Sequence, residues 1–130
     1  MVGSSICGHV AGEPSKKFVY EVISLDDISR ENNVLPDIIK LDLQGYEIEA
    51  LKGCKELLKT TELFMIEFGC LDAYLNRASV RDLIDLMFDN DYCLYDISDL
   101  AYRPYDNALT GGDFFFLKNS SKLRSYKAWK

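Results

Sequence analysis

Two acidic residues lie where two short apolar runs of the sequence end. Asp42 is in the run of residues 38–43, with Gly45 just beyond it, and Glu67 is near the end of the run of residues 63–68. Apolar runs of this length are typical of buried parallel strands, so an acid near the end of one is out of place. In open α/β sheets, ligands bind outside the carboxyl ends of the strands. We therefore expect Asp42 and Glu67 to face one crevice and treat them as candidate functional residues.

The same two acids also have a purely structural interpretation. Asp42 would order the turn before the next helix, and Glu67 would accept hydrogen bonds from exposed backbone amides. Gly45 is expected to permit a turn that a Cβ atom would forbid. Glu47 and Glu49 are interpreted as acids that complement a helix dipole rather than as catalysts. The residues alone leave both interpretations open.

The elements that would position these residues alternate between strand and helix. Strand-like composition predicts strands over residues 18–25, 38–43, 63–68, 92–97 and 113–117, with helical segments over 26–30, 46–58 and 79–87. This alternation predicts parallel crossovers, and the last two strands, with no helix between them, predict a terminal antiparallel pair. The run 38–43 is expected to be covered on both faces. Within it, Lys40 shares a face with Asp42.

Composition and charge exclude several classes of protein. The chain has 130 residues, of which 48% are hydrophobic, so it suits one domain with a genuine core. Its formal net charge of -6 argues against binding nucleic acid, which requires clustered basic residues. No stretch approaches the roughly 20 apolar residues that span a bilayer, and the start lacks the pattern of a signal peptide. We expect a soluble protein that binds neither nucleic acid nor membrane.

The cysteines and the histidine do not suggest a metal site. The four cysteines are widely spaced, so no zinc-binding or redox pair is present, and they are expected to be mainly small buried residues (Cys7, Cys54, Cys70 and Cys93). The single histidine, His9, lies in a stretch with loop-like composition. Unpaired thiols suit a reducing compartment, which predicts a cytoplasmic location. No metal is expected.

The chain divides into three parts by composition. Residues 1–16 are small, polar and glycine-containing, which predicts a loop-like segment. Residues 17–118 contain all the strand and helix patterns. Residues 119–130 form a basic tail, which we expect to be simply solvated (Lys122, Arg124, Lys127 and Lys130).

Four motifs together resemble the FkbM-type methyltransferase family. They are Ser-Leu-Asp-Asp-Ile at residues 24–28, Pro-Asp-Ile-Ile-Lys-Leu-Asp-Leu-Gln-Gly-Tyr-Glu at 36–47, Leu-Lys-Gly at 51–53 and Met-Ile-Glu-Phe at 65–68. The corresponding family pattern is Leu-Asp-Asp, then Lys-x-Asp-x-Glu-Gly-x-Glu, then Leu-Lys-Gly, then a strand ending in Ile-Glu. The resemblance runs from about Ser24 to Leu117, and the middle block is its most specific part.

The resemblance implies a fold, a cofactor and a reaction. The fold would be α/β, a partial Rossmann-like methyltransferase sheet formed by the C-terminal half of the domain. Such proteins use S-adenosylmethionine to methylate a hydroxyl, typically on a sugar or natural product. Carried over to this chain, Asp42 and Glu67 would be catalytic, with an acid as general base for the hydroxyl proton. Asp42, Gln44 and Gly45 would line the cofactor site.

The chain departs from the family pattern in two places. Gln44 stands where the family usually has Glu, which removes one negative charge from the candidate site. The glycine-rich turn that would seat the cofactor is also absent, because the only early glycine pair, Gly8 and Gly12, follows no strand and opens no helix. We therefore expect weak or no binding of S-adenosylmethionine by these residues alone.

Three hypotheses for function remain. The chain is one part of a methyltransferase that acts with a missing N-terminal half, or it is an inactive truncated or accessory α/β module, or it is a generic sugar- or nucleotide-binding piece with an accidental motif match. In the resembled fold, the strand at 38–43 lies beside the absent first strand. Its edge would be unpaired unless residues 18–25 cover it, so we expect a homodimer or association with another chain.

Overall fold

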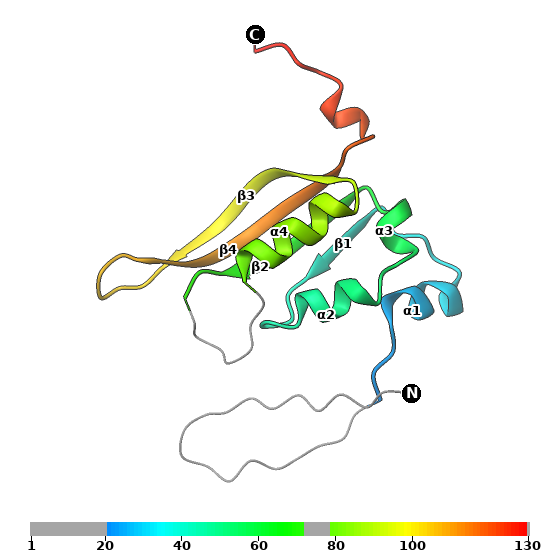
Figure 1. Cartoon of the computed structure of the whole chain (residues 1–130), viewed down its shortest axis with the longest axis horizontal. Helices are drawn as coiled ribbons and strands as arrows, with labels where there is room; N and C mark the ends of the chain where they lie inside the picture. Colours follow the sequence, from blue (N-terminus) through cyan, green and yellow to red (C-terminus); the bar gives the residue numbers. More distant parts are fainter. Residues whose placement is uncertain (1–20, 72–78, 130) are drawn as a thin grey trace.

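A four-stranded mixed sheet organises the chain, as a computed structural model shows for residues 21–71 and 79–129 (Figure 1). The elements are α1 (Leu25–Asn32), β1 (Ile38–Leu41), α2 (Glu47–Lys52), α3 (Leu57–Thr60), β2 (Leu63–Gly69), α4 (Val80–Asp89), β3 (Tyr92–Tyr102), β4 (Leu109–Lys118) and a short 3₁₀ turn, η1 (Lys122–Arg124). The predicted loop at 1–16, with His9 and its glycine pair, lies outside the described residues.

The sheet has the strand order β1-β2-β4-β3. β1 runs parallel to β2, whereas β4 is antiparallel to both β2 and β3. The predicted terminal antiparallel pair is therefore confirmed, and β4 inserts between the two strands that precede it. This mixed α/β sheet is compatible with the partial Rossmann-like fold that the sequence predicts.

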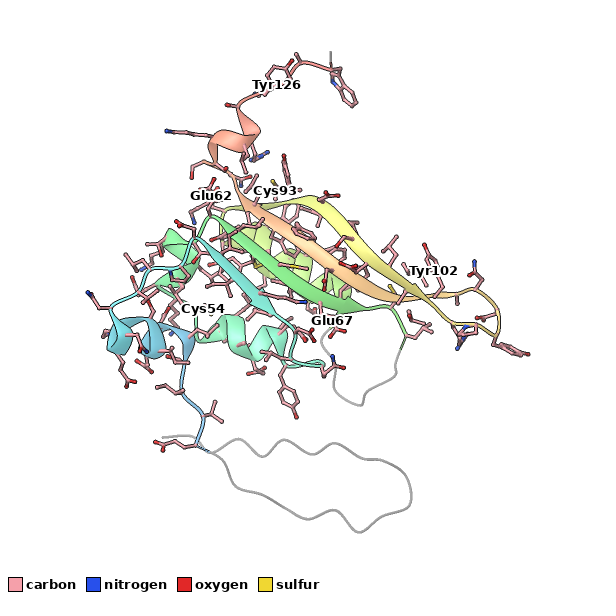
Figure 2. All side chains as sticks on the ribbon, turned by 180° about the vertical axis from the view of Figure 1, so that it is seen from behind. Cys54, Glu62, Glu67, Cys93, Tyr102 and Tyr126 are labelled. Atoms are coloured by element: carbon pink, nitrogen blue, oxygen red, sulfur yellow. The ribbon has the colours of Figure 1, made fainter. Side chains whose placement is uncertain are left out.

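One face of the sheet carries the hydrophobic core. Because strand side chains alternate, every second residue of β1, β2 and β4 points to this face and is buried (Ile39, Leu41, Phe64, Ile66, Phe68, Phe114 and Phe116). The buried side chains of the helices pack against them (Leu51, Leu57, Leu58, Leu83 and Met87). Figures 1 and 2 show α4 in front of the sheet from one side and behind the strands from the other.

The prediction that residues 38–43 form a strand covered on both faces is wrong. β1 ends at Leu41, and its burial alternates, with Ile39 and Leu41 buried but Ile38 63% exposed. Lys40, on the same face as Ile38, is also exposed, at 51% of its side chain. The apolar composition of residues 38–43 therefore does not mean that both faces of β1 are buried.

The predicted helix over residues 46–58 is two helices. α2 ends at Lys52, where the Gly53 N–H bonds back to the Ala50 carbonyl oxygen. α3 then begins with help from α1, because the Asp26 carboxylate accepts from the backbone amides of Glu56 (2.9 Å) and Leu57 (3.0 Å). A capping carboxylate supplied by a residue 30 positions earlier is a tertiary feature that helical periodicity does not reveal.

The strand predicted at residues 18–25 is not found in its described part. Residues 21–24 adopt no strand, and Leu25 is the first residue of α1; residues 18–20 lie outside the described residues. Ser24 explains this start, because its Oγ accepts from the Asp27 amide at 3.1 Å as a helix N-cap.

The helix start predicted at Ser79 is confirmed. Ser79 Oγ accepts from the Asp82 amide at 3.1 Å, and Asp82 Oδ2 accepts from the Ser79 amide at 3.2 Å. This reciprocal pair is a capping box, so the sequence fixes the beginning of α4 locally. α4 starts beside the end of β2, at the edge of the sheet where the candidate acids lie.

Candidate functional site

The side-chain amide of Gln44 joins the two candidate acids. Gln44 Nε2 donates to Asp42 Oδ1 at 3.0 Å and to Glu67 Oε2 at 3.2 Å. The parallel register pairs the last residue of β1, Leu41, with Ile66 of β2, so Asp42 and Glu67 are each the next residue along. The structure therefore brings Asp42, Gln44 and Glu67 together at the carboxyl ends of β1 and β2.

The turn that presents Gln44 is held by Glu47. Glu47 is only 4% exposed, and its Oε1 accepts from the backbone amides of Leu43 (3.0 Å) and Gly45 (3.1 Å). The turn places Gln44 at φ 53° and Gly45 at φ 107°, a conformation in which glycine avoids the clash of a Cβ. The need for Gly45 thus agrees with the sequence expectation.

Glu47 rather than Asp42 orders this turn. The sequence suggested that Glu47 only complements a helix dipole, but its buried carboxylate closes the loop through two backbone amides. The side chain of Asp42 instead contacts Gln44 and Lys40, with the Lys40 Nζ 3.7 Å from Asp42 Oδ2. Lys40 and Asp42 share a face as predicted.

Asp113 is a third acid in the same row, and sequence reasoning did not select it as a site residue. Its neighbour across the sheet is Glu67, because β2 and β4 pair these two positions. The Asp113 side chain is only 10% exposed, and Lys40 Nζ lies 3.9 Å from its Oδ2. One feature of the sequence could have identified Asp113. It is an acid between Gly111-Gly112 and a run of three phenylalanines, and an acid is unusual inside a buried strand.

Two glycines let β4 approach the site edge closely. Gly111 pairs with Gly69, and a Cβ atom added to Gly111 would lie 2.3 Å from the Phe68 carbonyl oxygen. A Cβ atom on Gly112 would lie 2.8 Å from the Ser98 carbonyl oxygen. The sequence Gly-Gly-Asp therefore holds Asp113 close to Glu67 in a way that larger residues would prevent.

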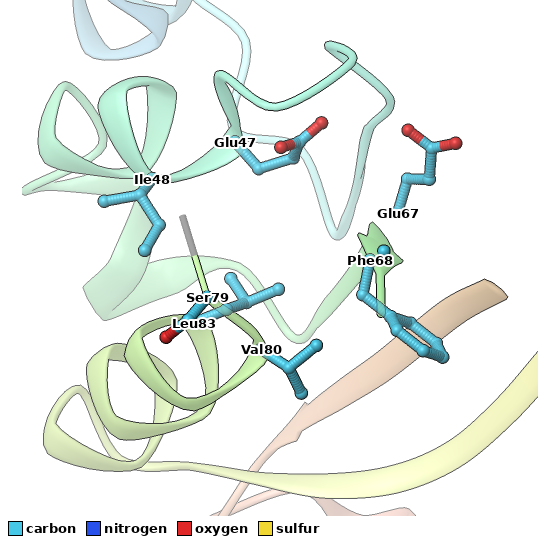
Figure 3. A pocket seen from close by; sticks show the side chains of 8 residues that line it. Glu47, Ile48, Glu67, Phe68, Ser79, Val80 and Leu83 are labelled. Carbon is cyan, nitrogen blue, oxygen red and sulfur yellow. The ribbon is translucent and has the colours of Figure 1, made fainter. Parts of the chain in front are cut away.

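The acids form an open wall rather than an enclosed pocket. The side chains of Lys40 and Asp42 are about half exposed, at 51% and 47%. Behind the wall, a hollow of about 10 Å³ lies between α2, the end of β2 and the start of α4 (Figure 3). Its lining includes Glu47, Glu67 and Val80, and a volume of this size holds roughly one water molecule. A substrate would therefore bind against the exposed side of the row.

The chemistry of this wall is anionic with hydrogen-bond acceptors. It combines three carboxylates with one ammonium and one amide (Asp42, Glu67, Asp113, Lys40 and Gln44). Such a surface attracts cations and hydroxyl donors and repels phosphates. Among residues 21–71 and 79–129, no group of three or more His, Cys, Asp or Glu side chains is arranged to hold a metal ion. The described helices include none with the length and apolarity to cross a bilayer.

Comparison with known proteins identifies the family of this sequence. A model of the methyltransferase FkbM domain matches residues 3–96, which is more than half of the chain. The match includes α1, β1, β2 and α4, and thus Asp42, Gln44 and Glu67. No curated protein and no solved structure matches the chain. A match of this extent excludes an accidental resemblance confined to the short motif around Asp42.

Proposed function

Because this chain belongs to the FkbM methyltransferase family, we propose that it takes part in methyl transfer from S-adenosylmethionine to a hydroxyl of a sugar or natural product. The observation that carries the proposal is the amide of Gln44 bonded to both Asp42 and Glu67. It makes one chemical site from the turn after β1 and the end of β2.

Asp42 is the proposed general base. One carboxylate oxygen accepts from Gln44 and the other lies 3.7 Å from the Lys40 ammonium, so both contacts hold the carboxylate in place. Its side chain is 47% exposed, so an acceptor hydroxyl can reach it. Asp42 would accept the proton that the hydroxyl loses when it is methylated. Glu67 lines the same wall and orients the acceptor.

The residues present suit a sulfonium cofactor. When bound, S-adenosylmethionine supplies a methyl group whose bond to sulfur breaks with both electrons remaining on sulfur. The wall at Asp42, Glu67 and Asp113 has more carboxylates than its single ammonium neutralises, which suits a cation. Gly45 has no side chain to block close approach at the turn. Asp42, Gln44 and Gly45 are therefore the residues proposed to contact the cofactor.

The proposal is tested by measuring transfer of a radiolabelled methyl group from S-adenosylmethionine to a panel of sugars and hydroxylated natural products. The Asp42→Asn variant is expected to lose roughly a hundredfold or more of the rate, the range typical of a missing general base. Asp85→Asn is the control, because Asp85 is an exposed acid on α4 paired with Arg81. Full activity in Asp42→Asn would exclude Asp42 as the base.

Cofactor binding is tested separately by calorimetry. We expect weak or no binding of S-adenosylmethionine by the 130 residues alone, since residues 21–71 and 79–129 contain no glycine-rich turn between a strand and a helix. A micromolar Kd for the purified chain would overturn this expectation. If the chain binds only when an N-terminal strand and glycine-rich turn are joined to it, the half-domain interpretation is supported.

A second candidate function is that of an accessory module that associates through a sheet edge. Within the described residues, β1 pairs only with β2, and Ile38 on β1 is 63% exposed. An unpaired strand edge is a template for another strand. The proposed partner is a second copy of the chain or the N-terminal half of such a domain. We also propose a cytoplasmic location, which suits the free thiols of Cys54, Cys70 and Cys93.

A further inference from the structure

The first residues after β4, Asn119 to Ser121, are hydrogen-bonded to the rest of the domain. The Asn119 backbone amide donates to the Asp91 carbonyl oxygen at 2.9 Å, and the Asn119 side chain donates to the Asp91 carboxylate, also at 2.9 Å. Ser121 Oγ donates to Glu62 Oε1 at 2.6 Å and accepts from the Leu123 amide, which caps η1. These hydrogen bonds therefore set the direction in which the chain leaves the sheet.

After Ser121, large apolar side chains are exposed at every third position. Leu123 is 63% exposed, Tyr126 is 73% exposed and Trp129 is fully exposed. Figure 2 shows this part of the chain extending away from the sheet. Leaving a leucine and two large aromatic residues in water is unfavourable, and such groups mark interaction surfaces. Their clustering within seven residues indicates a binding segment.

The charge of the segment is opposite to that of the rest of the chain. Residues 119–130 contain four basic residues and no acid, whereas the whole chain has a formal charge of -6. Lys122, Arg124 and Lys127 alternate with the exposed apolar residues, so one short segment combines positive charge with apolar side chains. The partner is therefore anionic and has an apolar layer within reach of the charge.

We propose that residues 122–129 bind the surface of a membrane that contains anionic phospholipids. Tyrosine and tryptophan rings favour the headgroup level of a bilayer, and basic side chains are attracted to anionic headgroups. The segment lies on the surface and does not span it. This proposal departs from the expectation from sequence, in which the basic tail was only solvated and no membrane was a partner.

A membrane at this position leaves the candidate methyl-transfer site accessible. Asp113 of the acidic wall lies near the middle of β4, and five residues of strand, roughly 17 Å, separate it from Lys118, after which the segment begins. Figure 2 shows Tyr126 and Glu67 at different ends of the sheet. The acidic wall would be repelled by anionic headgroups, and its distance from the segment avoids this conflict. The membrane proposal does not depend on the proposed function.

The chain contains a single tryptophan, so the fluorescence of Trp129 reports directly on this segment. The experiment titrates the full chain with vesicles of phosphatidylcholine alone and with vesicles that contain one third phosphatidylserine. We expect the emission of Trp129 to shift to shorter wavelength only with the anionic vesicles, as the indole leaves water. The shift should disappear in about 0.5 M salt, because salt screens the attraction.

Charge-reversal variants show whether vesicle binding depends on this segment or only on the net charge of the chain. Changing Lys122, Arg124 and Lys127 to Glu is expected to weaken vesicle binding about a hundredfold. The control changes three exposed lysines on α2, on α3 and in the turn between them to Glu, with an equal change in net charge (Lys52, Lys59 and Lys55). We expect the control to bind as the unchanged chain does.

Several outcomes would overturn the proposal. One is an unchanged Trp129 emission with both kinds of vesicle. Another is an equal loss of binding in the control variant, which would assign the effect to net charge. A third is binding to polyglutamate but not to anionic vesicles, which would indicate an acidic protein as the partner. Binding to phosphatidylcholine alone with no effect of salt would exclude the anionic headgroup as the ligand.

Discussion

Gln44 donates its side-chain amide to Glu67 at 3.2 Å, across 23 positions of the sequence. This contact joins the turn after β1 to the carboxyl end of β2. The same amide reaches Asp42 at 3.0 Å, so one neutral donor lies between two carboxylates. A Glu at this position would instead place three carboxylates together and would add repulsion. The replacement of the family's usual Glu by Gln44 therefore has a structural consequence.

The interaction between Gln44 and Glu67 is measurable as a coupling free energy. We expect the double-mutant cycle of Gln44→Ala and Glu67→Ala, followed by urea unfolding, to give a favourable coupling of about 0.5–1 kcal/mol, the size of a solvent-accessible hydrogen bond. Gln44→Glu should make the coupling unfavourable. A coupling of zero in the first cycle would show that the contact is not maintained in solution.

Glu47 is predicted to be important for stability despite its charge. Glu47→Ala removes the acceptor of two backbone hydrogen bonds at a buried position, so unfolding free energy should fall by about 2–4 kcal/mol. Glu49→Ala on the same helix is the matched control. Glu49 is exposed and forms a surface ion pair with Lys52, so its loss should cost less than about 0.5 kcal/mol. Equal losses for the two variants would contradict the assigned role of Glu47.

Alkaline pH is predicted to destabilise the fold through Cys54. Burial, and then the nearby charge of Asp26, raise the pKa of the Cys54 thiol to about 11. The unfolded chain loses this proton near pH 9 and the folded chain retains it, so stability is full below pH 9 and falls between pH 9 and about 11. The loss is about 3 kcal/mol over these two pH units. Cys54→Ala should remove this part of the pH dependence, as followed by thermal unfolding.

Tyr92 adds to the alkaline effect at higher pH. Burial, followed by the charges of Asp91 and Cys54, raises the pKa of its hydroxyl, which lies 2.5 Å from the Thr61 carbonyl oxygen. Its contribution should therefore remain in Cys54→Ala above pH 10, and Tyr92→Phe should remove it. An identical pH profile in the parent chain and in both variants would contradict these assignments.

The edge of β1 is predicted to control self-association. Ile38→Lys places a charge on the exposed edge strand and should shift the chain towards a monomer, because charged edges disfavour strand pairing. Light scattering at micromolar concentration measures the change. Tyr105→Lys is the control, since Tyr105 is 90% exposed in the turn between β3 and β4, far along the sequence from β1. A monodisperse monomer without any substitution would argue against edge association.

The sequence by itself determined the local features of this protein. The capping box of Ser79 and Asp82 and the strands around Leu41 and Ile66 are encoded by neighbouring residues and by periodicity. The motif around Asp42 also fixed the family, because its spacing is specific enough to recognise without any contact being known. These features depend on short-range interactions, which a single sequence displays directly.

Tertiary structure decided how the acids meet and what holds them. The buried role of Glu47, the capping of α3 by Asp26 and the alignment of Asp113 beside Glu67 depend on residues that lie far apart in sequence or on a turn with unusual backbone angles. The break of the predicted helix at Gly53 also involves a distant residue, because the Asp26 backbone amide donates to the Gly53 carbonyl oxygen at 3.3 Å. Periodicity reports which residues can be buried, but the partner of a buried carboxylate is set only when separate strands and helices pack together.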